Sequence, residues 1–169
     1  MSAGVVPEPR FCALCGSATE MRVVKQGERT RSVCTVCGRV HYTGPRVAAG
    51  AICEKEGEIL LVQRGIQPGY GLWAYPGGFV DLGETTAEGA VREAREEAGV
   101  ELRITGLVGV YENPLRAVVV VVHAAEVVGG EAEALDETLA VKWARPEAID
   151  PAELAFETTR QAFRDYLRR

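Results

Sequence analysis

The stretch from Gly78 to Val100 reads GFVDLGETTAEGAVREAREEAGV, and it carries the most informative chemistry of the chain. Its second half predicts a helix over residues 85–99. Glu93, Glu96 and Glu97 are spaced as i, i+3 and i+4, so they project from one face of that helix. Carboxylates crowded on one turn repel each other, and a hard divalent cation such as Mg²⁺ or Mn²⁺ relieves the repulsion. The alternative is a solvated acidic helix face with ordinary charge pairs.

The residues around these glutamates favour the metal site. Gly78 and Gly83 permit sharp bends, so a main-chain carbonyl at Gly78 can also face a cation. Arg92 can reach back to Glu84 and fix the preceding loop against the helix. These flanking residues, at fixed offsets, are not needed for a plain solvated helix.

The same stretch resembles the Nudix box, G-x5-E-x7-R-E-U-x-E-E-x-G-U, in which U is aliphatic. The one mild departure is Ala94, where a larger aliphatic residue is typical. Two further stretches, Gly71–Gly78 before the box and Asp136–Ile149 after it, also resemble Nudix domains. The likeness covers roughly residues 46–169 and implies an α/β fold, an α/β/α sandwich around a mixed sheet.

The resemblance also implies a function: hydrolysis of the diphosphate linkage in a nucleoside diphosphate derivative, dependent on Mg²⁺ or Mn²⁺. By position in the box, the metal ligands would be Glu93, Glu96, Glu97 and the Gly78 carbonyl, with Glu84 and Arg92 in structural roles. A general base is harder to assign. One of the box glutamates could serve, or Glu137 from a later acidic loop, whose alternative is a solvated surface residue.

Candidate substrate contacts are Arg64 for a phosphate and the aromatic residues Trp73, Tyr75 and Phe79 for a base; the alternative for each is surface exposure or packing. Within the Nudix family, the NADH pyrophosphatases that this chain resembles have a Ser-Gln-Pro-Trp-Pro-Phe-Pro-type stretch after the box. This chain has Tyr111-Glu112-Asn113-Pro114-Leu115-Arg116 instead. ADP-ribose or FAD is therefore favoured over NADH as the small-molecule nucleotide substrate.

Four of the five cysteines lie in two C-x2-C pairs near the N-terminus: Cys12, Cys15, Cys34 and Cys37. The C-x2-C-x18-C-x2-C spacing is typical of a structural Zn²⁺ site. Residues 1–45 are therefore predicted to form a zinc ribbon, with short strands at 21–25 and 29–33, in front of a catalytic domain over 46–169. His41 is expected to be a surface or packing residue, because four thiolates complete the zinc shell.

The net charge of −5 argues against a partner held mainly by phosphate electrostatics, so a nucleic-acid partner is not expected. No secretory or membrane signal is evident, and we expect a cytoplasmic protein with reduced thiols. Resemblance alone suggests a homodimer.

Two other functions remain open. The chain could be an inactive binding or regulatory module, which the intact glutamate set disfavours. It could also cleave nucleoside triphosphates or an RNA cap. In that case RNA could contact the basic residues of the ribbon, which are Arg22, Lys25, Arg29, Arg31 and Arg39. The simpler interpretation is that these residues form a solvated surface.

Elsewhere in the catalytic domain the residue pattern predicts loops over 65–78 and after Gly129, and a final helix over 153–169. Strands are predicted over 46–54, 58–64, 102–111, 116–127 and 139–143. Cys53 lies within the first of these strands and is expected to be buried and inert.

Overall fold

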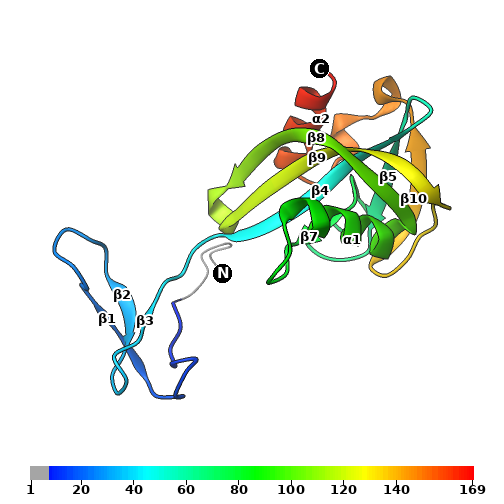
Figure 1. The fold of residues 1–169 in the computed structure, drawn as a ribbon. Helices are drawn as coiled ribbons and strands as arrows, with labels where there is room; N and C mark the ends of the chain where they lie inside the picture. Colours follow the sequence, from blue (N-terminus) through cyan, green and yellow to red (C-terminus); the bar gives the residue numbers. More distant parts are fainter. Residues whose placement is uncertain (1–7) are drawn as a thin grey trace. The chain divides into compact units, whose positions relative to one another are not determined.

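The computed structural model describes residues 8–169, and the chain divides into two compact units (Figure 1). Among the described residues, one unit consists of residues 8–45 with Pro114–Ala117, and the other of Arg46–Asn113 with Val118–Arg169. Within residues 8–169, no helix is long and apolar enough to cross a membrane.

The smaller unit is built on a three-stranded antiparallel sheet of β1 (Thr19–Arg22), β2 (Arg31–Cys34) and β3 (Val40–His41), in that order. The ladder begins beside the cysteines, where Thr19 pairs with Cys34, and ends where Arg22 pairs with Arg31. The predicted strands at 21–25 and 29–33 were therefore too close to the turn. Pairing is anchored at the cysteine end, and residues 23–30 form a long connecting loop.

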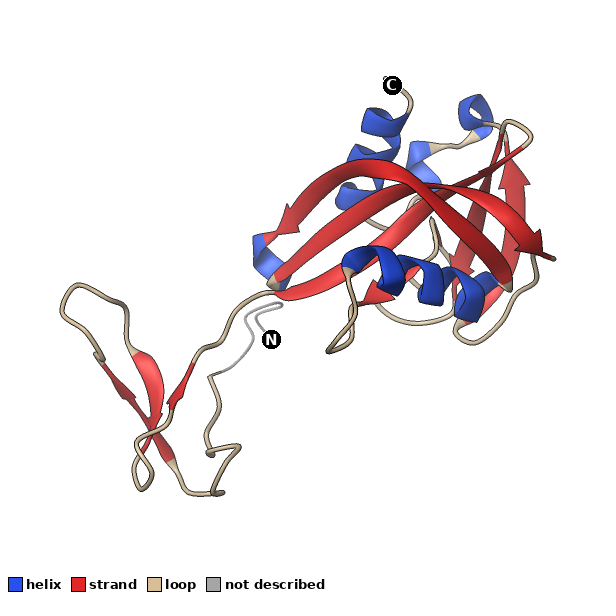
Figure 2. Ribbon diagram, in the orientation of Figure 1, coloured by secondary structure: helices blue, strands red, loops and turns tan. Residues whose placement is uncertain are grey.

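The larger unit is organised around a mixed sheet (Figure 2). Its seven strands are β4 (Arg46–Lys55), β5 (Glu58–Arg64), β6 (Trp73–Ala74), β7 (Gly77–Phe79), β8 (Val100–Asn113), β9 (Val118–Gly130) and β10 (Thr138–Ala144). Their order in the sheet is β10-β5-β4-β9-β8, with β6 paired with β5 and β7 paired with β4. Strands β4 and β9 run parallel, and the other pairs are antiparallel.

Helices α1 (Thr86–Ala98) and α2 (Glu157–Tyr166) cover opposite faces of this sheet. Because side chains alternate along a strand, the packing of β4 and β5 identifies the two faces. Ala51 and Leu60 belong to the cluster under α1, whereas their neighbours Ile52 and Ile59 belong to the cluster under α2. The predicted α/β/α sandwich around a mixed sheet is confirmed.

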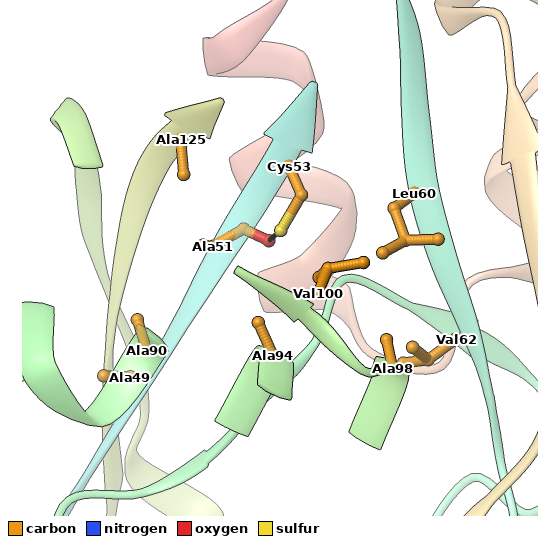
Figure 3. Packing of buried hydrophobic residues seen from close by; sticks show 10 residues of the cluster. All are labelled: Ala49, Ala51, Cys53, Leu60, Val62, Ala90, Ala94, Ala98, Val100 and Ala125. Carbon is orange, nitrogen blue, oxygen red and sulfur yellow. Dashed lines mark hydrogen bonds between the residues drawn. The ribbon is translucent and has the colours of Figure 1, made fainter. Parts of the chain in front are cut away.

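The contact between α1 and the sheet is made of small residues. Ala90, Ala94 and Ala98 lie on the buried side of the helix and are completely inaccessible to solvent. They face Ala49, Ala51, Cys53, Leu60, Val62, Val100 and Ala125 (Figure 3). Small side chains bring the helix backbone close to the sheet, so the polar face of α1 is held at a fixed height above it.

Cys53 is buried in β4, as predicted, and its Sγ donates a hydrogen bond to the carbonyl of Ala51 at 3.3 Å. Burial raises the pKa of this thiol, which keeps it protonated.

Two predicted elements were wrong. The stretch 65–78 is not all loop, since it contains β6 and the start of β7. The final helix does not begin at residue 153: Pro151–Glu153 is a short 3₁₀ turn, and α2 begins at Glu157. Between them Leu154 forms a parallel bridge with Trp73, and the Ala155 N–H donates to the Trp73 carbonyl at 2.9 Å. This pairing with β6 holds the chain extended where helical periodicity predicted a continuous helix.

Two further short 3₁₀ turns lie at Pro114–Arg116 and at Pro146–Ala148.

Candidate functional site

Both ends of α1 are fixed by local interactions. Thr85 Oγ1 accepts a hydrogen bond from the Glu88 N–H at 3.2 Å, and Glu88 Oε2 accepts one from the Thr85 N–H at 2.8 Å, which together form a capping box. Gly99 ends the helix in the left-handed conformation with φ 69°. With the ends fixed and the alanine face buried, the side chains on the outer face have defined positions.

Arg92 connects the helix to the loop before it. Its Nε donates to Glu84 Oε1 at 2.7 Å, and its Nη2 donates to Glu84 Oε2 and to the Phe79 carbonyl, each at 3.0 Å. The predicted ion pair between Arg92 and Glu84 is therefore present. The Arg92 hydrogen bonds hold the pKa of Glu84 below its ordinary value, so the loop is locked by a charged pair.

The same guanidinium also contacts the helix glutamates. Arg92 Nη1 lies 2.8 Å from Glu93 Oε1 and 2.9 Å from Glu96 Oε2. Arg92 thus forms hydrogen bonds with three carboxylates. These bonds raise the pKa of Arg92, and its positive charge compensates part of the negative charge of the three glutamates.

Glu97 is the most enclosed of the three predicted metal ligands. Its Oε2 accepts a hydrogen bond from the Gly77 N–H at 2.9 Å. Burial raises the pKa of Glu97 to about 7, and the negative charge of Glu93 acts in the same direction. Burial likewise raises the pKa of Glu93, with a further contribution from Glu96.

Gly77 and Gly78 make this arrangement possible because neither position has room for a side chain. A Cβ on Gly78 would lie 2.4 Å from Glu93 Oε1, and a Cβ on Gly77 would lie 2.7 Å from the Ala49 carbonyl oxygen. The backbone of β7 therefore approaches the Glu93 carboxylate closely, as a main-chain ligand beside that carboxylate requires.

The donor set suits a hard divalent cation. Glu93, Glu96 and Glu97 supply carboxylate oxygens from one helix face, and two of them have pKa values raised by burial and mutual repulsion. A bound cation would offset the electrostatic repulsion between these carboxylates. The three carboxylates are held apart, however: among the described residues, only the cysteines bring three or more acidic, His or Cys ligand atoms within 4.8 Å of one another.

Arg64 and Glu137 lie on the Glu97 side of the site. Arg64 is half-buried, its Nε donates to the Pro68 carbonyl at 3.0 Å, and the charges of Glu97 and Glu137 both act on it. The Glu137 carbonyl accepts a hydrogen bond from the Gly65 N–H at 2.7 Å, and the Glu137 side chain is exposed. The structure therefore brings these three predicted residues into electrostatic contact.

The predicted aromatic contacts differ from one another in the structure. Tyr75 is only 6% exposed and packs in the core against Phe163, with ring centroids 6.0 Å apart, so its ring is not open to a nucleotide base in this structure. Its position next to a Gly-rich stretch gave no sign of burial. Trp73 is half-buried, and Phe79 is 39% exposed.

Two cations that sequence reasoning missed cover the remaining aromatic rings. The Arg46 guanidinium lies 3.1 Å from the Phe79 ring centroid, and Lys142 Nζ lies 4.1 Å from the Trp73 ring centroid. Both contacts arise from strand register. Ala48 in β4 pairs with Phe79 in β7, which places Phe79 near Arg46. Strand β5 pairs with both β6 and β10, with Gln63 opposite Trp73 and Leu61 opposite Lys142. No local sequence signal reveals them.

The four N-terminal cysteines form the second candidate centre. Their Sγ atoms are separated by 3.7 Å for Cys12 and Cys37, 3.5 Å for Cys15 and Cys34, and 3.6 Å for Cys15 and Cys37. A tetrahedron with zinc–sulfur distances of about 2.3 Å has edges of about 3.8 Å, whereas a disulfide requires about 2.05 Å. The spacing fits a four-thiolate zinc site.

His41 is not part of this centre. It lies in β3 and is half-buried, and its Nε2 is buried with no hydrogen-bond partner among the described residues.

Comparison with known proteins finds matches for both parts of the chain. A family model described as a NUDIX domain matches residues 44–166, and one described as Nudix N-terminal matches residues 10–43. An ADP-ribose pyrophosphatase of Methanocaldococcus jannaschii is 43% identical over 100 residues, which make up 57% of this chain and 59% of that protein. The NAD-capped RNA hydrolase NudC of Pseudomonas aeruginosa is 31% identical over 144 residues, 84% of this chain and 50% of that protein.

The chain thus spans 59% and 50% of the lengths of these two curated relatives. Among solved structures, a NUDIX hydrolase from Nitrosomonas europaea is 31% identical and superposes with a TM-score of 0.89, covering 95% of this chain and 91% of that one.

Proposed function

Because the chain belongs to the Nudix family, we propose that it is a pyrophosphohydrolase that uses Mg²⁺ or Mn²⁺ to cleave the diphosphate linkage of a nucleoside diphosphate derivative. The observation that carries this proposal is the intact acidic face of α1, with Glu97 held by the Gly77 N–H and Glu93 placed against Gly78. We assign the catalytic role to residues 46–169 and a structural zinc ribbon to residues 1–45.

The proposed mechanism begins with the carboxylates. Glu93, Glu96 and Glu97, with the Gly78 carbonyl, would hold the divalent cation. When bound, the cation neutralises diphosphate charge and lowers the pKa of the attacking water. Arg92 keeps Glu93 and Glu96 in place and ties the loop to the helix through Glu84. Water attack on one phosphorus then releases the two halves of the substrate.

Proton removal from the attacking water requires a base within reach of the cation. Glu137 is our candidate, because its exposed side chain acts electrostatically on both Glu97 and Arg64. A box glutamate remains the alternative. Arg64 places a fixed positive charge beside these carboxylates, where it would orient a substrate phosphate.

The proposed substrate is ADP-ribose or FAD, with NADH less favoured. The relative named ADP-ribose pyrophosphatase supports the first choice, and the relative named as a hydrolase of NAD-capped RNA supports a substrate that resembles NAD. Trp73 and Phe79 are the candidate residues for the nucleotide base, and each would have to share or exchange its stacked cation, Lys142 or Arg46.

A substrate panel tests the proposal. Purified protein with Mg²⁺ or Mn²⁺ is assayed for AMP release from ADP-ribose, FAD and NADH, and for phosphate or pyrophosphate release from nucleoside triphosphates. AMP release from at least one of the first three is expected. Release from none of them would refute the proposed substrate class.

The Glu97→Gln variant distinguishes an enzyme from a binding module. It keeps an acceptor for the Gly77 N–H but removes the charge, and we expect it to abolish turnover. Glu112→Gln is the matched control, since Glu112 is an exposed residue of β8 outside the site. Equal activity in Glu97→Gln and Glu112→Gln would contradict the assignment.

A further inference from the structure

The net charge of the chain conceals an uneven distribution. Residues 8–45 contain six Lys or Arg and three Asp or Glu, whereas residues 46–169 contain thirteen and twenty-one. The positive charge of the small unit is concentrated in and beside the β1–β2 hairpin, in Arg22, Lys25, Arg29 and Arg31. The overall negative charge therefore does not disfavour a polyanionic partner for this unit.

Two of these cations occupy directly opposed positions. Arg22 in β1 pairs with Arg31 in β2, and like charges placed opposite each other destabilise a strand pair. Arg22 is paired with Glu20, but both side chains are about half exposed and such pairs contribute little. Arg31 makes no ion pair among the described residues, and its Nε is buried without a hydrogen-bond partner. An anionic ligand would relieve this repulsion.

An exposed aromatic ring completes the row across the sheet. The Arg31 guanidinium lies 5.2 Å from the centroid of the Tyr42 ring, and Tyr42 is 68% exposed. Arg31 therefore covers part of the ring and leaves most of the residue open to solvent. Open aromatic rings beside Arg are what unpaired nucleobases stack on, because every base has a π-face.

The thiolates of the cysteine site lie at the other end of the hairpin. Cys34 is three residues from Arg31 along β2, which is about 10 Å at 3.4 Å per residue and about one Debye length at 0.1 M salt. The cations are thus largely screened from the negative charge of a four-thiolate zinc centre.

We propose that the face formed by Arg22, Arg31 and Tyr42, with Lys25 and Arg29 of the connecting loop, binds a single-stranded polynucleotide. The cations contact its phosphates, and one base stacks on Tyr42. A duplex is disfavoured because its bases are already stacked and cannot reach the ring. The inference does not rest on the proposed hydrolase function, since no residue of this face belongs to the acidic site.

Fluorescence anisotropy with a labelled U12 RNA and the full-length protein, without added Mg²⁺ or Mn²⁺, tests the proposal. The logarithm of Kd is expected to rise with the logarithm of salt concentration, with a slope of about 2 to 3 for three or four phosphate contacts. A parallel titration with dT12 shows whether the face distinguishes RNA from DNA. Equal affinity for dT12 and U12 would mean that it binds single strands of either kind, and weaker binding of dT12 would mean that it prefers RNA.

Variants of the face give the specific readouts. Tyr42→Ala is expected to weaken binding about 10-fold, and Tyr42→Phe, which retains the ring, less than about 2-fold. The double variant Lys25→Ala/Arg29→Ala should lower the salt slope by about 1.4. Arg103→Ala, which removes an exposed cation of β8, is the matched control and should bind as the unaltered protein does.

Zinc content of each variant reports whether the small unit is folded. If Tyr42→Ala loses zinc, the loop double variant decides the result, because Lys25 and Arg29 are exposed. The proposal is overturned if U12 does not bind at 50 mM salt, if a 12-base-pair duplex binds as well as U12, or if the loop double variant binds no differently from Arg103→Ala.

Discussion

At the scale of single residues, one arginine and two glycines, Gly77 and Gly78, hold the closely spaced carboxylates of the site in position. Arg92 contacts Glu84, Glu93 and Glu96 at once, because a planar guanidinium carries five donors in fixed directions. A lysine, with one compact ammonium group, cannot make these contacts together. Glu97 lies beyond its reach and is held by the Gly77 N–H instead.

The close approach of Gly78 to Glu93 leads to a specific prediction. In Gly78→Ala, the new Cβ would lie 2.4 Å from Glu93 Oε1 and 2.6 Å from Oε2, so the carboxylate has to move. Displacing a catalytic group by about 1 Å can lower activity about 100-fold, and we expect kcat/KM to fall by that order. Steady-state assays on the best substrate of the panel measure it.

Gly44→Ala is the matched control, because a Cβ at Gly44 meets no atom of residues 8–169 within 4 Å and the residue has no positive φ. Its activity should be unchanged. Full activity in Gly78→Ala would show that the Glu93 position is not critical.

At the scale of elements, α1 was predicted almost to the residue, whereas α2 and the short strands were not. The ends of α1 depend on Thr85, Glu88 and Gly99, which lie within or next to the helix, so local sequence contains the information. The start of α2 depends on Leu154 pairing with β6, and β6 and β7 exist only because β5 and β4 pair with them. Such tertiary pairing is not visible in a local pattern.

The capping box gives a stability prediction. Thr85→Ala removes the side-chain acceptor for the Glu88 N–H and should lower the free energy of unfolding by about 1 kcal/mol. Thr85→Ser keeps the hydroxyl and should retain most of it. Urea denaturation of the two variants and the unaltered protein measures the difference, and equal midpoints for all three would show that the cap contributes nothing.

At the scale of the whole molecule, the sequence predicted which residues meet within one helix and its preceding loop but not which meet across the sheet. The ion pair between Glu84 and Arg92 followed from their spacing. The contacts of Arg46 with Phe79 and of Lys142 with Trp73, and the burial of Tyr75, depend on the register of strands distant in sequence. The missed features are therefore those that the folded sheet creates.

Stability of the large unit should depend on pH through His123. This residue of β9 is buried, its Nε2 lies 3.1 Å from Thr86 Oγ1, and burial lowers its pKa from 6.5. The unfolded chain therefore binds a proton at His123 more readily than the folded one. The contribution of His123 to stability is fully present above pH 6.5 and decreases as the pH drops below it. One proton changes the free energy of unfolding by at most about 1.4 kcal/mol per pH unit.

The comparison that isolates this effect is between the unaltered protein and His123→Gln. Glu97 acts in the opposite sense without a bound cation, because its raised pKa of about 7 weakens the fold as the pH rises from 4.5 towards 7. Both proteins share that contribution. Urea midpoints at pH 7.5 and 5.5 should therefore fall more steeply in the unaltered protein, and parallel curves would exclude His123 as the source.

Zinc removal tests the division of the chain into two units. Within residues 8–45, the small unit has only a three-stranded sheet and few buried apolar residues, Val33 among them, so its stability should come from the four thiolates and their metal. Chelation should therefore unfold β1 to β3 and leave the large sheet intact. Amide hydrogen exchange should become fast in β2 while β4 and β9 stay protected.

The number of reactive thiols before and after zinc removal provides an independent test. The zinc-loaded protein should contain one zinc per chain and resist a thiol reagent, whereas the chelated protein should expose four reactive thiols, Cys12, Cys15, Cys34 and Cys37. Cys53 should stay unreactive because it is completely buried in β4. Cys34→Ser should lose zinc and Cys53→Ala should keep it. Five reactive thiols, or loss of protection in β4, would mean that the large unit depends on the zinc site for its fold.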